Sequence, residues 1–213
     1  MCNLDEIKLL VEDRQIDVLC ISETWLSPDL PDHFIDIPNY NLYRCDYGKG
    51  GGVCIYVKID LKIKVLNLEI EKLEGVEHIW LTIQHRMLPS VIIGCVYRHP
   101  KAAVNSFEYI SNILKIICMK KKPIFVLGDL NDNQFNPNSK LIKIVKRLNL
   151  NQLIKKPTRI TRTSSTLLDV IITNNVEKVI QSDVYPGPVA DHELISVCID
   201  IKKPKKIPRQ KRF

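Results

Sequence analysis

Short apolar runs, separated by polar or glycine-containing turns, set the hydrophobic pattern of this chain. Some runs alternate apolar and polar side chains, as half-buried β-strands do, and others are apolar throughout, as buried strands are. Three further segments repeat apolar residues at helical spacing. The pattern predicts about nine strands and three helices. The strands fall within 16–22, 40–46, 48–57, 61–68, 76–84, 89–98, 123–129, 167–174 and 193–201, and the helices within 4–14, 104–118 and 139–148.

The order of these segments indicates a mixed α/β fold. Neighbouring strands joined by short turns favour antiparallel pairing, whereas a helix between two strands favours a crossover. Two mixed, mostly antiparallel sheets packed face to face, with helices outside, would use all of the elements. A chain of 213 residues suits one such domain, which we place at residues 1–201.

Composition indicates the cellular compartment in which the protein is expected to fold. The chain is 45% hydrophobic and 26% charged, as folded domains are. Its seven cysteines include no C-x-x-C pair, and Cys20, Cys54, Cys95 and Cys198 lie inside apolar runs, so we expect buried free thiols in a reducing compartment. No apolar run approaches the roughly 20 residues of a membrane span, and no signal peptide opens the chain. We expect an intracellular protein, nuclear or cytoplasmic, with no membrane partner.

The net charge of +7 comes from the C-terminus. Seven of the 31 basic residues lie in the last thirteen residues, and the other basic residues equal the 24 acidic residues in number. The pI near 9.0 therefore describes a tail and not a basic domain. Residues 202–213 are expected to form a basic tail or linker, either solvated or a nuclear-localisation or nucleic-acid-binding segment.

Acidic, amide, tyrosine and histidine side chains recur where the predicted strands begin or end. Any one of them alone is typical of a turn, but the whole set is not. Its members are Glu23, Tyr97, Asp129 with Asn131, Asp169, and Asp191 with His192.

Phosphodiester hydrolysis needs such a set. Hard divalent cations prefer carboxylates, a role that suits Glu23 and Asp191. A cation and a protonated histidine neutralise the charge that builds up on phosphorus. Asp129 can orient or deprotonate the attacking water, and Asn131 can hold that water or a phosphate oxygen. Asp169 can fix the tautomer of a histidine and keep it protonated.

These motifs resemble the endonuclease/exonuclease/phosphatase superfamily. The matching segments are "ISETWLS", "KGGGVCIYV", "VYRHP", "LGDLN", "PTRITRTSSTLLDVIITN" and "ADHELI". The "GGGV" and "PTR…SSTLLD" segments are most similar to the apurinic-type endonuclease domain of non-LTR, jockey-like LINE retrotransposons. The resemblance covers nearly the whole chain to about residue 200, and it implies a four-layer α/β sandwich.

The resemblance also implies roles and partners. Glu23 would be a metal ligand, with Asp191 at the metal-proximal end. Tyr97 would contact the scissile phosphate, and Asp129, beside Asn131, would activate the water. Asp169 would pair with His192, which stabilises the phosphate. The implied cofactor is Mg²⁺, with Mn²⁺ as a substitute, and the implied substrate is DNA, nicked to leave a 3′-hydroxyl.

The chain departs from the family pattern at its start. The family begins with a strand that carries an asparagine, whereas this sequence starts at the helix within 4–14. We therefore expect the first strand to be missing, which would expose a sheet edge. Two alternatives to an active nuclease follow. One is a catalytically impaired fragment or remnant that acts at most as a DNA-binding module, and the other is a superfamily phosphatase or phosphodiesterase on another substrate.

Several neighbours of the motif residues are also given roles. Trp25 is expected to pack beneath the metal site. Arg98 is a candidate DNA contact. Thr158, Arg159, Thr161, Arg162 and Thr163 form a loop suited to phosphate contacts or to an ordinary surface. Asp132, Asn133 and Asn136 are expected to be turn and helix-entry residues.

Overall fold

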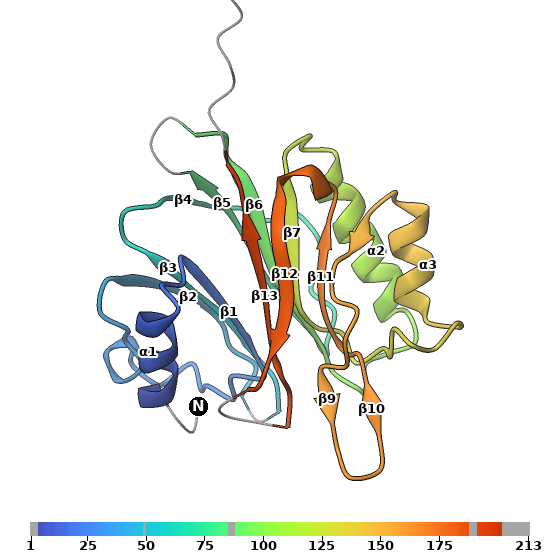
Figure 1. The fold of residues 1–213 in the computed structure, drawn as a ribbon, viewed down its shortest axis with the longest axis horizontal. Helices are drawn as coiled ribbons and strands as arrows, with labels where there is room; N and C mark the ends of the chain where they lie inside the picture. Colours follow the sequence, from blue (N-terminus) through green and yellow to red (C-terminus); the bar gives the residue numbers. More distant parts are fainter. Residues whose placement is uncertain (1–3, 49, 85–87, 188–190, 202–213) are drawn as a thin grey trace, which may run out of the picture.

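The protein folds into four layers, two sheets face to face with helices outside each (Figure 1). The computed structural model describes residues 4–48, 50–84, 88–187 and 191–201. The expected basic tail, 202–213, lies outside these residues. The predicted four-layer α/β sandwich is confirmed.

The elements follow the predicted segments closely. The helices are α1 (Leu4–Asp13), α2 (Ser106–Cys118) and α3 (Lys140–Arg147), with short 3₁₀ turns η1 (Asp32–Phe34) and η2 (Val176–Lys178). The strands are β1 (Val18–Ser22), β2 (Tyr40–Cys45), β3 (Val53–Lys58), β4 (Lys62–Val65), β5 (Val76–Gln84), β6 (Val91–Arg98), β7 (Ile124–Asp129), β8 (Asn151–Gln152), β9 (Arg159–Ile160), β10 (Ser165–Thr166), β11 (Asp169–Thr173), β12 (Val179–Tyr185) and β13 (Leu194–Ile199).

The larger sheet has the strand order β4-β5-β6-β7-β11-β8. Its pairs are antiparallel except β6 and β7, which are parallel and joined by the crossover helix α2. Helices α2 and α3 cover its outer face (Figure 1). Ile110, Ile113, Leu114 and Ile117 of α2 are buried because they recur on one face at helical spacing. The parallel pair brings the ends of β6 and β7 to the same edge of the sheet.

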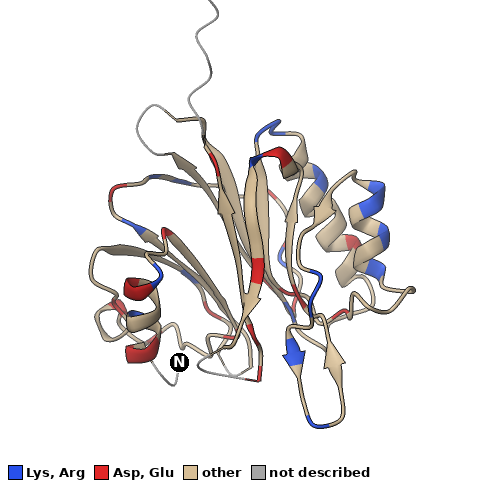
Figure 2. Ribbon diagram, in the orientation of Figure 1, with Lys and Arg blue, Asp and Glu red and all other residues tan. Residues whose placement is uncertain are grey.

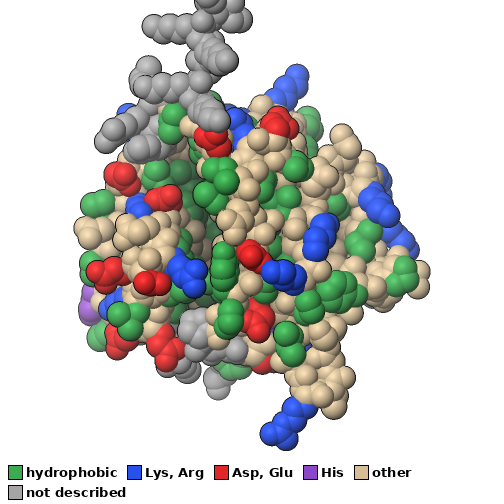
Figure 3. Space-filling view, viewed as in Figure 1, with side chains coloured by type: hydrophobic (Ala, Val, Ile, Leu, Met, Phe, Trp, Pro, Cys, Tyr) green, Lys and Arg blue, Asp and Glu red, His purple; other side chains and the backbone are tan. Residues whose placement is uncertain are grey.

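The second layer is split into two parts. β1, β3 and β2 form one sheet under α1, and β12 with β13 form a separate hairpin. β1 packs over β6 and β7 of the larger sheet, and β13 packs over β11. In the described part of the chain no strand pairs with the free edges of β1 and β13, as expected from the sequence. Figure 3 shows the surface hollowed along this split.

Apolar side chains of both layers meet in one core. β3, β6 and β7 contribute fully buried residues such as Ile55, Cys95 and Phe125. Along the split the inward side chains of β13, including Val197, are only partly buried. A partly buried aliphatic strand gains less of the roughly 25 cal/mol per Å² that burial provides, so β13 contributes less to stability than the buried β3.

Three expectations about local structure were wrong. Strand β12 was not predicted, because its middle is polar and its apolar Ile180 is 66% exposed. The helix predicted within 104–118 begins later than expected, because Val104 precedes α2 and is 89% exposed. Cys198 is exposed, because it lies on the outer face of β13, whereas Cys54 and Cys95 are buried as expected. All described cysteines are free thiols.

Membrane insertion through a helix finds no support in the described residues, since none of their helices combines the length and the apolarity that a crossing requires.

Candidate active site

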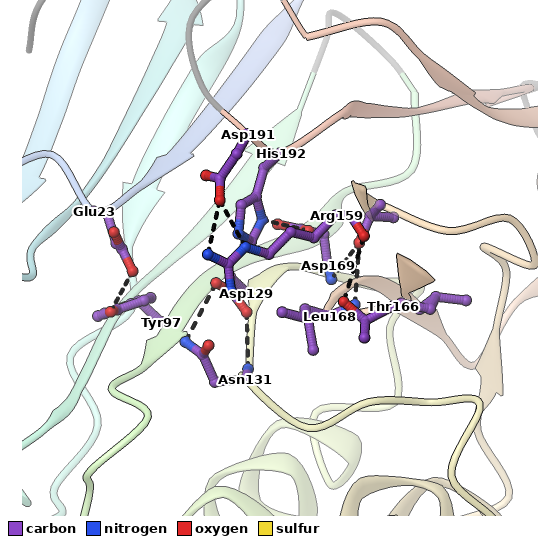
Figure 4. Close-up of polar contacts among 12 residues, drawn as sticks. Glu23, Tyr97, Asp129, Asn131, Arg159, Thr166, Leu168, Asp169, Asp191 and His192 are labelled. Atoms are coloured by element: carbon purple, nitrogen blue, oxygen red, sulfur yellow. Dashed lines mark hydrogen bonds and ion pairs between the residues drawn. The ribbon is translucent and has the colours of Figure 1, made fainter. Parts of the chain in front are cut away.

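The predicted site residues come from both layers and meet at one edge of the sandwich (Figure 4). Glu23 follows β1, Tyr97 lies near the end of β6, and Asp129 ends β7. Asp169 begins β11 and pairs directly with Asp129 across the antiparallel ladder. The parallel β6–β7 pair and the antiparallel β7–β11 pair together explain why residues far apart in sequence share this edge.

A tight turn holds the Asp129 carboxylate. The Asn131 N–H donates to Asp129 Oδ1 over 2.8 Å, and its side-chain Nδ2 lies 3.3 Å from Oδ2. The same Nδ2 donates to the main-chain oxygen of Arg98 over 3.0 Å. Asn131 has a φ of 47°, a left-handed conformation that asparagine tolerates better than most residues. Its amide therefore supports Asp129 and ties β7 to the end of β6.

Gly128 permits the close approach of β6 and β7 at this turn. Its φ is 144°, and an added Cβ would lie 1.8 Å from the main-chain oxygen of Val96. No side chain fits there without moving the backbone, so the "LGDLN" segment requires glycine before the aspartate.

Asp169 and His192 form a hydrogen-bonded pair. His192 Nδ1 lies 2.8 Å from Asp169 Oδ2, and Asp169 is 8% exposed. The buried hydroxyl of Thr158 accepts the N–H groups of Leu168 and Asp169, both over 3.0 Å, and so fixes the start of β11. The main-chain oxygen of Thr158 accepts the Glu193 N–H over 2.7 Å. Thr158 thus positions both partners of the pair.

The electrostatics of the site raise the pKa of Asp129 and that of His192. Burial, and then the charge of Asp169, raise the pKa of Asp129 to about 7, although the Asn131 N–H and His192 oppose this. Burial alone would lower the pKa of His192, but the hydrogen bond and charge of Asp169 outweigh it, so the pKa is raised. The site holds more negative charge than its own cations neutralise.

Glu23 bonds to Tyr97 across the two layers. The Tyr97 hydroxyl donates to Glu23 Oε1 over 2.5 Å, and Tyr97 is 1% exposed. Burial, followed by the Glu23 hydrogen bond, raises the pKa of the phenol. Glu23 has a φ of 52°, and the next N–H groups, of Thr24 and Trp25, donate to the oxygens of Gly52 and Gly51. The glycine-rich turn before β3 therefore holds the Glu23 loop.

Asp191 pairs with Arg159 at the rim. Arg159 Nε and Nη2 both contact Asp191 Oδ2, at 2.8 and 2.7 Å. This pairing lowers the pKa of Asp191. Arg159 and His192 also form an isolated antiparallel bridge, so the β9–β10 hairpin packs against the loop that carries the histidine.

Three of the predicted residues could hold a cation together. One ligand atom from each of Asp129, Asp169 and His192 lies within 4.8 Å of the others. Glu23 and Asp191, the predicted metal ligands, instead contact Tyr97 and Arg159, although the Glu23 charge still acts on Asp129. Burial and neighbouring negative charge make it costly for these carboxylates to ionise. A hard divalent cation, which prefers oxygen ligands, would offset that cost.

Sequence reasoning missed Glu77 and misplaced Trp25. Glu77 lies opposite Tyr97 in the β5–β6 ladder and is 6% exposed, and burial raises its pKa while the Gly52 N–H lowers it. The sequence feature that could have revealed Glu77 is a charged residue inside the largely apolar strand segment "GVEHIW". Trp25 does not pack beneath the site but is 60% exposed, because the Glu23 loop turns its side chain outward.

The loop of residues 158–163 divides into structural and exposed parts. Thr158 is fully buried and its hydroxyl accepts backbone N–H groups, and Thr161 hydrogen-bonds to Ser164 within the hairpin turn. Arg162 is exposed at the hairpin turn, whereas Arg159 is engaged by Asp191. Asp132, Asn133 and Asn136 accept backbone N–H groups in the turn before α3, as expected.

Comparisons with known proteins agree with this geometry. A sequence model described as "Endonuclease/Exonuclease/phosphatase family" matches residues 2–192. A search of curated proteins found no match. Among solved structures, the endonuclease domain of TRAS1, a telomere-specific non-LTR retrotransposon, is 15% identical with a TM-score of 0.71, over 92% of this chain and 91% of that one.

Other similar structures differ in activity. An AP endonuclease from Archaeoglobus fulgidus is 13% identical with a TM-score of 0.68, over 93% of this chain and 94% of that one. A mannosyl-6-phosphatase from Bacteroides thetaiotaomicron is 13% identical with a TM-score of 0.67, over 93% of this chain and 91% of that one. At these identities the likeness establishes the fold.

Proposed function

Because the chain belongs to the endonuclease/exonuclease/phosphatase family, we propose that it is a magnesium-dependent phosphodiesterase that nicks DNA. One observation carries the proposal. The buried carboxylates of Asp129 and Asp169 lie together beside His192, at an edge that Glu23 and Tyr97 also reach. Buried carboxylates without enough cationic partners destabilise a fold, so their presence together indicates a functional site and not a structural one.

In this proposal each residue has a separate task. Asp129 accepts a proton from the attacking water, and its raised pKa is near the operating pH of a general base. Asn131 keeps the Asp129 carboxylate in place. Protonated His192 donates to a non-bridging phosphate oxygen, and Asp169 holds its ring and its charge. Tyr97 orients the Glu23 carboxylate and contacts the phosphate. As the water oxygen bonds to phosphorus, the P–O3′ bond breaks and the departing O3′ takes a proton from solvent, which leaves a 3′-hydroxyl and a 5′-phosphate.

The residues also fit the proposed cation. Glu23 and Asp191 are the carboxylates that would hold it, once released from Tyr97 and Arg159, beside the cluster of Asp129, Asp169 and His192. A bound Mg²⁺ would supply charge neutralisation at the phosphate. Mn²⁺, which prefers similar oxygen ligands, would substitute for it.

DNA is the substrate that two observations favour. The "GGGV" and "PTR…SSTLLD" segments resemble the retrotransposon branch, and nucleases are among the similar structures. The test is nicking of supercoiled plasmid by the purified protein with Mg²⁺, beside an RNA and a sugar phosphate as competing substrates. Nicked circles are expected with Mg²⁺ and not with EDTA. Turnover of only the sugar phosphate would overturn the choice of DNA.

A non-catalytic DNA-binding module is the alternative, favoured by the split second layer. Glu23 follows β1, and β1 is an edge strand, so this ligand has support on one side only. Displacements of about 1 Å can cost roughly 100-fold in rate. Salt-dependent DNA binding without nicking at any pH or metal would select this alternative.

Magnesium is expected to stabilise the protein more at pH 8 than at pH 5.5. The folded-state pKa of Asp129 is raised to about 7, so between the ordinary value and pH 7 the fold retains a proton that the unfolded chain loses. Stability of the metal-free protein therefore falls as pH rises through this window. A divalent cation offsets this loss of stability only at pH values at which Asp129 is ionised.

Thermal unfolding measures this effect. Mg²⁺ at about ten times its dissociation constant should raise Tm by about 3 °C at pH 8 and by less than about 1 °C at pH 5.5. NaCl of equal ionic strength is the control. An equal rise at both pH values would contradict the placement of the cation beside Asp129.

Trp25 is expected to stack on a nucleobase beside the cleaved phosphate. It follows Glu23 by two residues and is 60% exposed, whereas Trp80, the other tryptophan, is 2% exposed. DNA should therefore quench the emission of Trp25 and leave that of Trp80. Stacking is worth about 1–3 kcal/mol per base, so Trp25→Ala should weaken binding about 5- to 100-fold. Trp25→Phe is the control, which should bind DNA without quenching, and quenching that survives it would refute the stacking.

A further inference from the structure

A groove of about 360 Å³ lies between α2 and α3, on the outer face of the larger sheet. Its walls carry four cations: Lys115 on α2 and Lys140, Lys143 and Arg147 on α3. The three α3 residues lie on one face of the helix, at a spacing of three and four. Figure 2 shows basic positions in blue along α3, and Figure 3 shows basic side chains at that edge of the molecule.

Little negative charge opposes these cations. Glu108 is the one carboxylate in the described lining, and none of the described ion pairs joins it to a groove cation. Lys115 donates to the Asn112 side chain and Arg147 to the buried Ser111 hydroxyl. Residues 133–168 contain eight basic residues and no acidic one, although the chain before the tail is balanced. Like charges on facing helices repel, so this face is suited to an anionic ligand.

The groove begins next to the candidate active site. Arg98, whose oxygen accepts from Asn131, donates from Nε to Ser106 Oγ at the start of α2 over 2.8 Å. The Phe107 ring, which lines the groove, lies 4.3 Å from the Arg98 guanidinium carbon and 5.7 Å from Lys140 Nζ. Both helices start at this edge and run away from it, so the groove leads outward from the site (Figure 1).

We propose that the α2–α3 groove binds the sugar-phosphate backbone of a single-stranded DNA segment that continues from the strand held in the active site. The inference rests on the proposed function for its choice of DNA. A groove between two adjacent helices, whose axes pack about 8–10 Å apart, admits one strand and not a duplex about 20 Å wide. Its α3 wall is about 12 Å long, enough for a few successive phosphates. Its contacts are to phosphates, so the binding is independent of base sequence.

The test compares the same duplex with and without a single-stranded overhang of about eight nucleotides. Binding is measured by fluorescence anisotropy in EDTA, which prevents cleavage. The overhang should tighten binding by wild-type protein about 10-fold, with a steeper salt dependence. The double variant Lys115→Gln, Lys143→Gln should lose most of this gain and lower the salt slope by about 2, yet bind the blunt duplex unchanged.

A charge-matched control separates the groove from general charge. Lys62→Gln with Lys64→Gln removes two exposed lysines from β4 and should retain the overhang effect. Inorganic polyphosphate is the competitor, and if it displaced the overhang as well as single-stranded DNA does, the groove would bind any polyanion and the proposed ligand would be overturned. An overhang effect equal in the groove variant and wild type would overturn the site. Absence of nicking with the overhang effect intact would refute the proposed function alone.

Discussion

Replacing Asp129 with asparagine is expected to lower magnesium-dependent nicking about 10³-fold or more, yet to stabilise the metal-free protein at pH 8. Asparagine retains the shape and one acceptor for the Asn131 N–H, but it cannot take a proton from water. It also removes the charge that burial and Asp169 oppose. Relief of that opposition should raise the free energy of unfolding by about 1–3 kcal/mol at pH 8.

The control is a carboxylate three residues away. Asp132 Oδ2 accepts from the Leu141 N–H over 2.8 Å and from the Ser139 hydroxyl over 2.7 Å at the start of α3. Asp132→Ala should therefore cost about 1–2 kcal/mol of stability and leave nicking within a few-fold. Rates on supercoiled plasmid and urea unfolding measure both quantities. Loss of stability in Asp129→Asn would mean that the carboxylate serves the fold.

Replacing Asp169 with asparagine is expected to lower nicking about 10²- to 10⁴-fold, chiefly in kcat. The hydrogen bond and charge of Asp169 keep the pKa of His192 above its ordinary value, so the variant histidine loses its proton at a lower pH. In the wild type this stabilisation is fully present below pH 6.5, the ordinary pKa of histidine, and is lost as pH rises through the folded pKa. The variant should therefore lose more stability at pH 6 than at pH 9.

Two measurements separate this role from packing. Titration of the His192 ring by NMR should show the lowered pKa directly. His192→Ala in the Asp169→Asn background should reduce the rate little further, because the two side chains act as one unit. If the two substitutions multiplied their effects, or if the His192 pKa stayed raised, Asp169 would not be the partner that controls the histidine.

Much of the site was readable from the chain because its residues sit at strand ends. A buried strand is an apolar run, and a polar residue at either end of the run lies at the sheet edge. This is why Tyr97, Asp129, Asn131 and Asp169 could be selected before the fold was known. Their pairings were less readable. The sequence did not show that Asn131 hydrogen-bonds to Asp129, or that Glu23 hydrogen-bonds to Tyr97 from the other layer.

By itself the sequence determined the fold class, the family and most of the elements in their order, although not β12, because hydrophobic period and motif spacing are local properties of the chain. Tertiary structure alone decided the rest. It set the Arg159–Asp191 ion pair, the exposure of Trp25 and the basic groove between α2 and α3. These depend on strand register and on which surfaces face each other, and such long-range contacts leave no periodic signal in the chain.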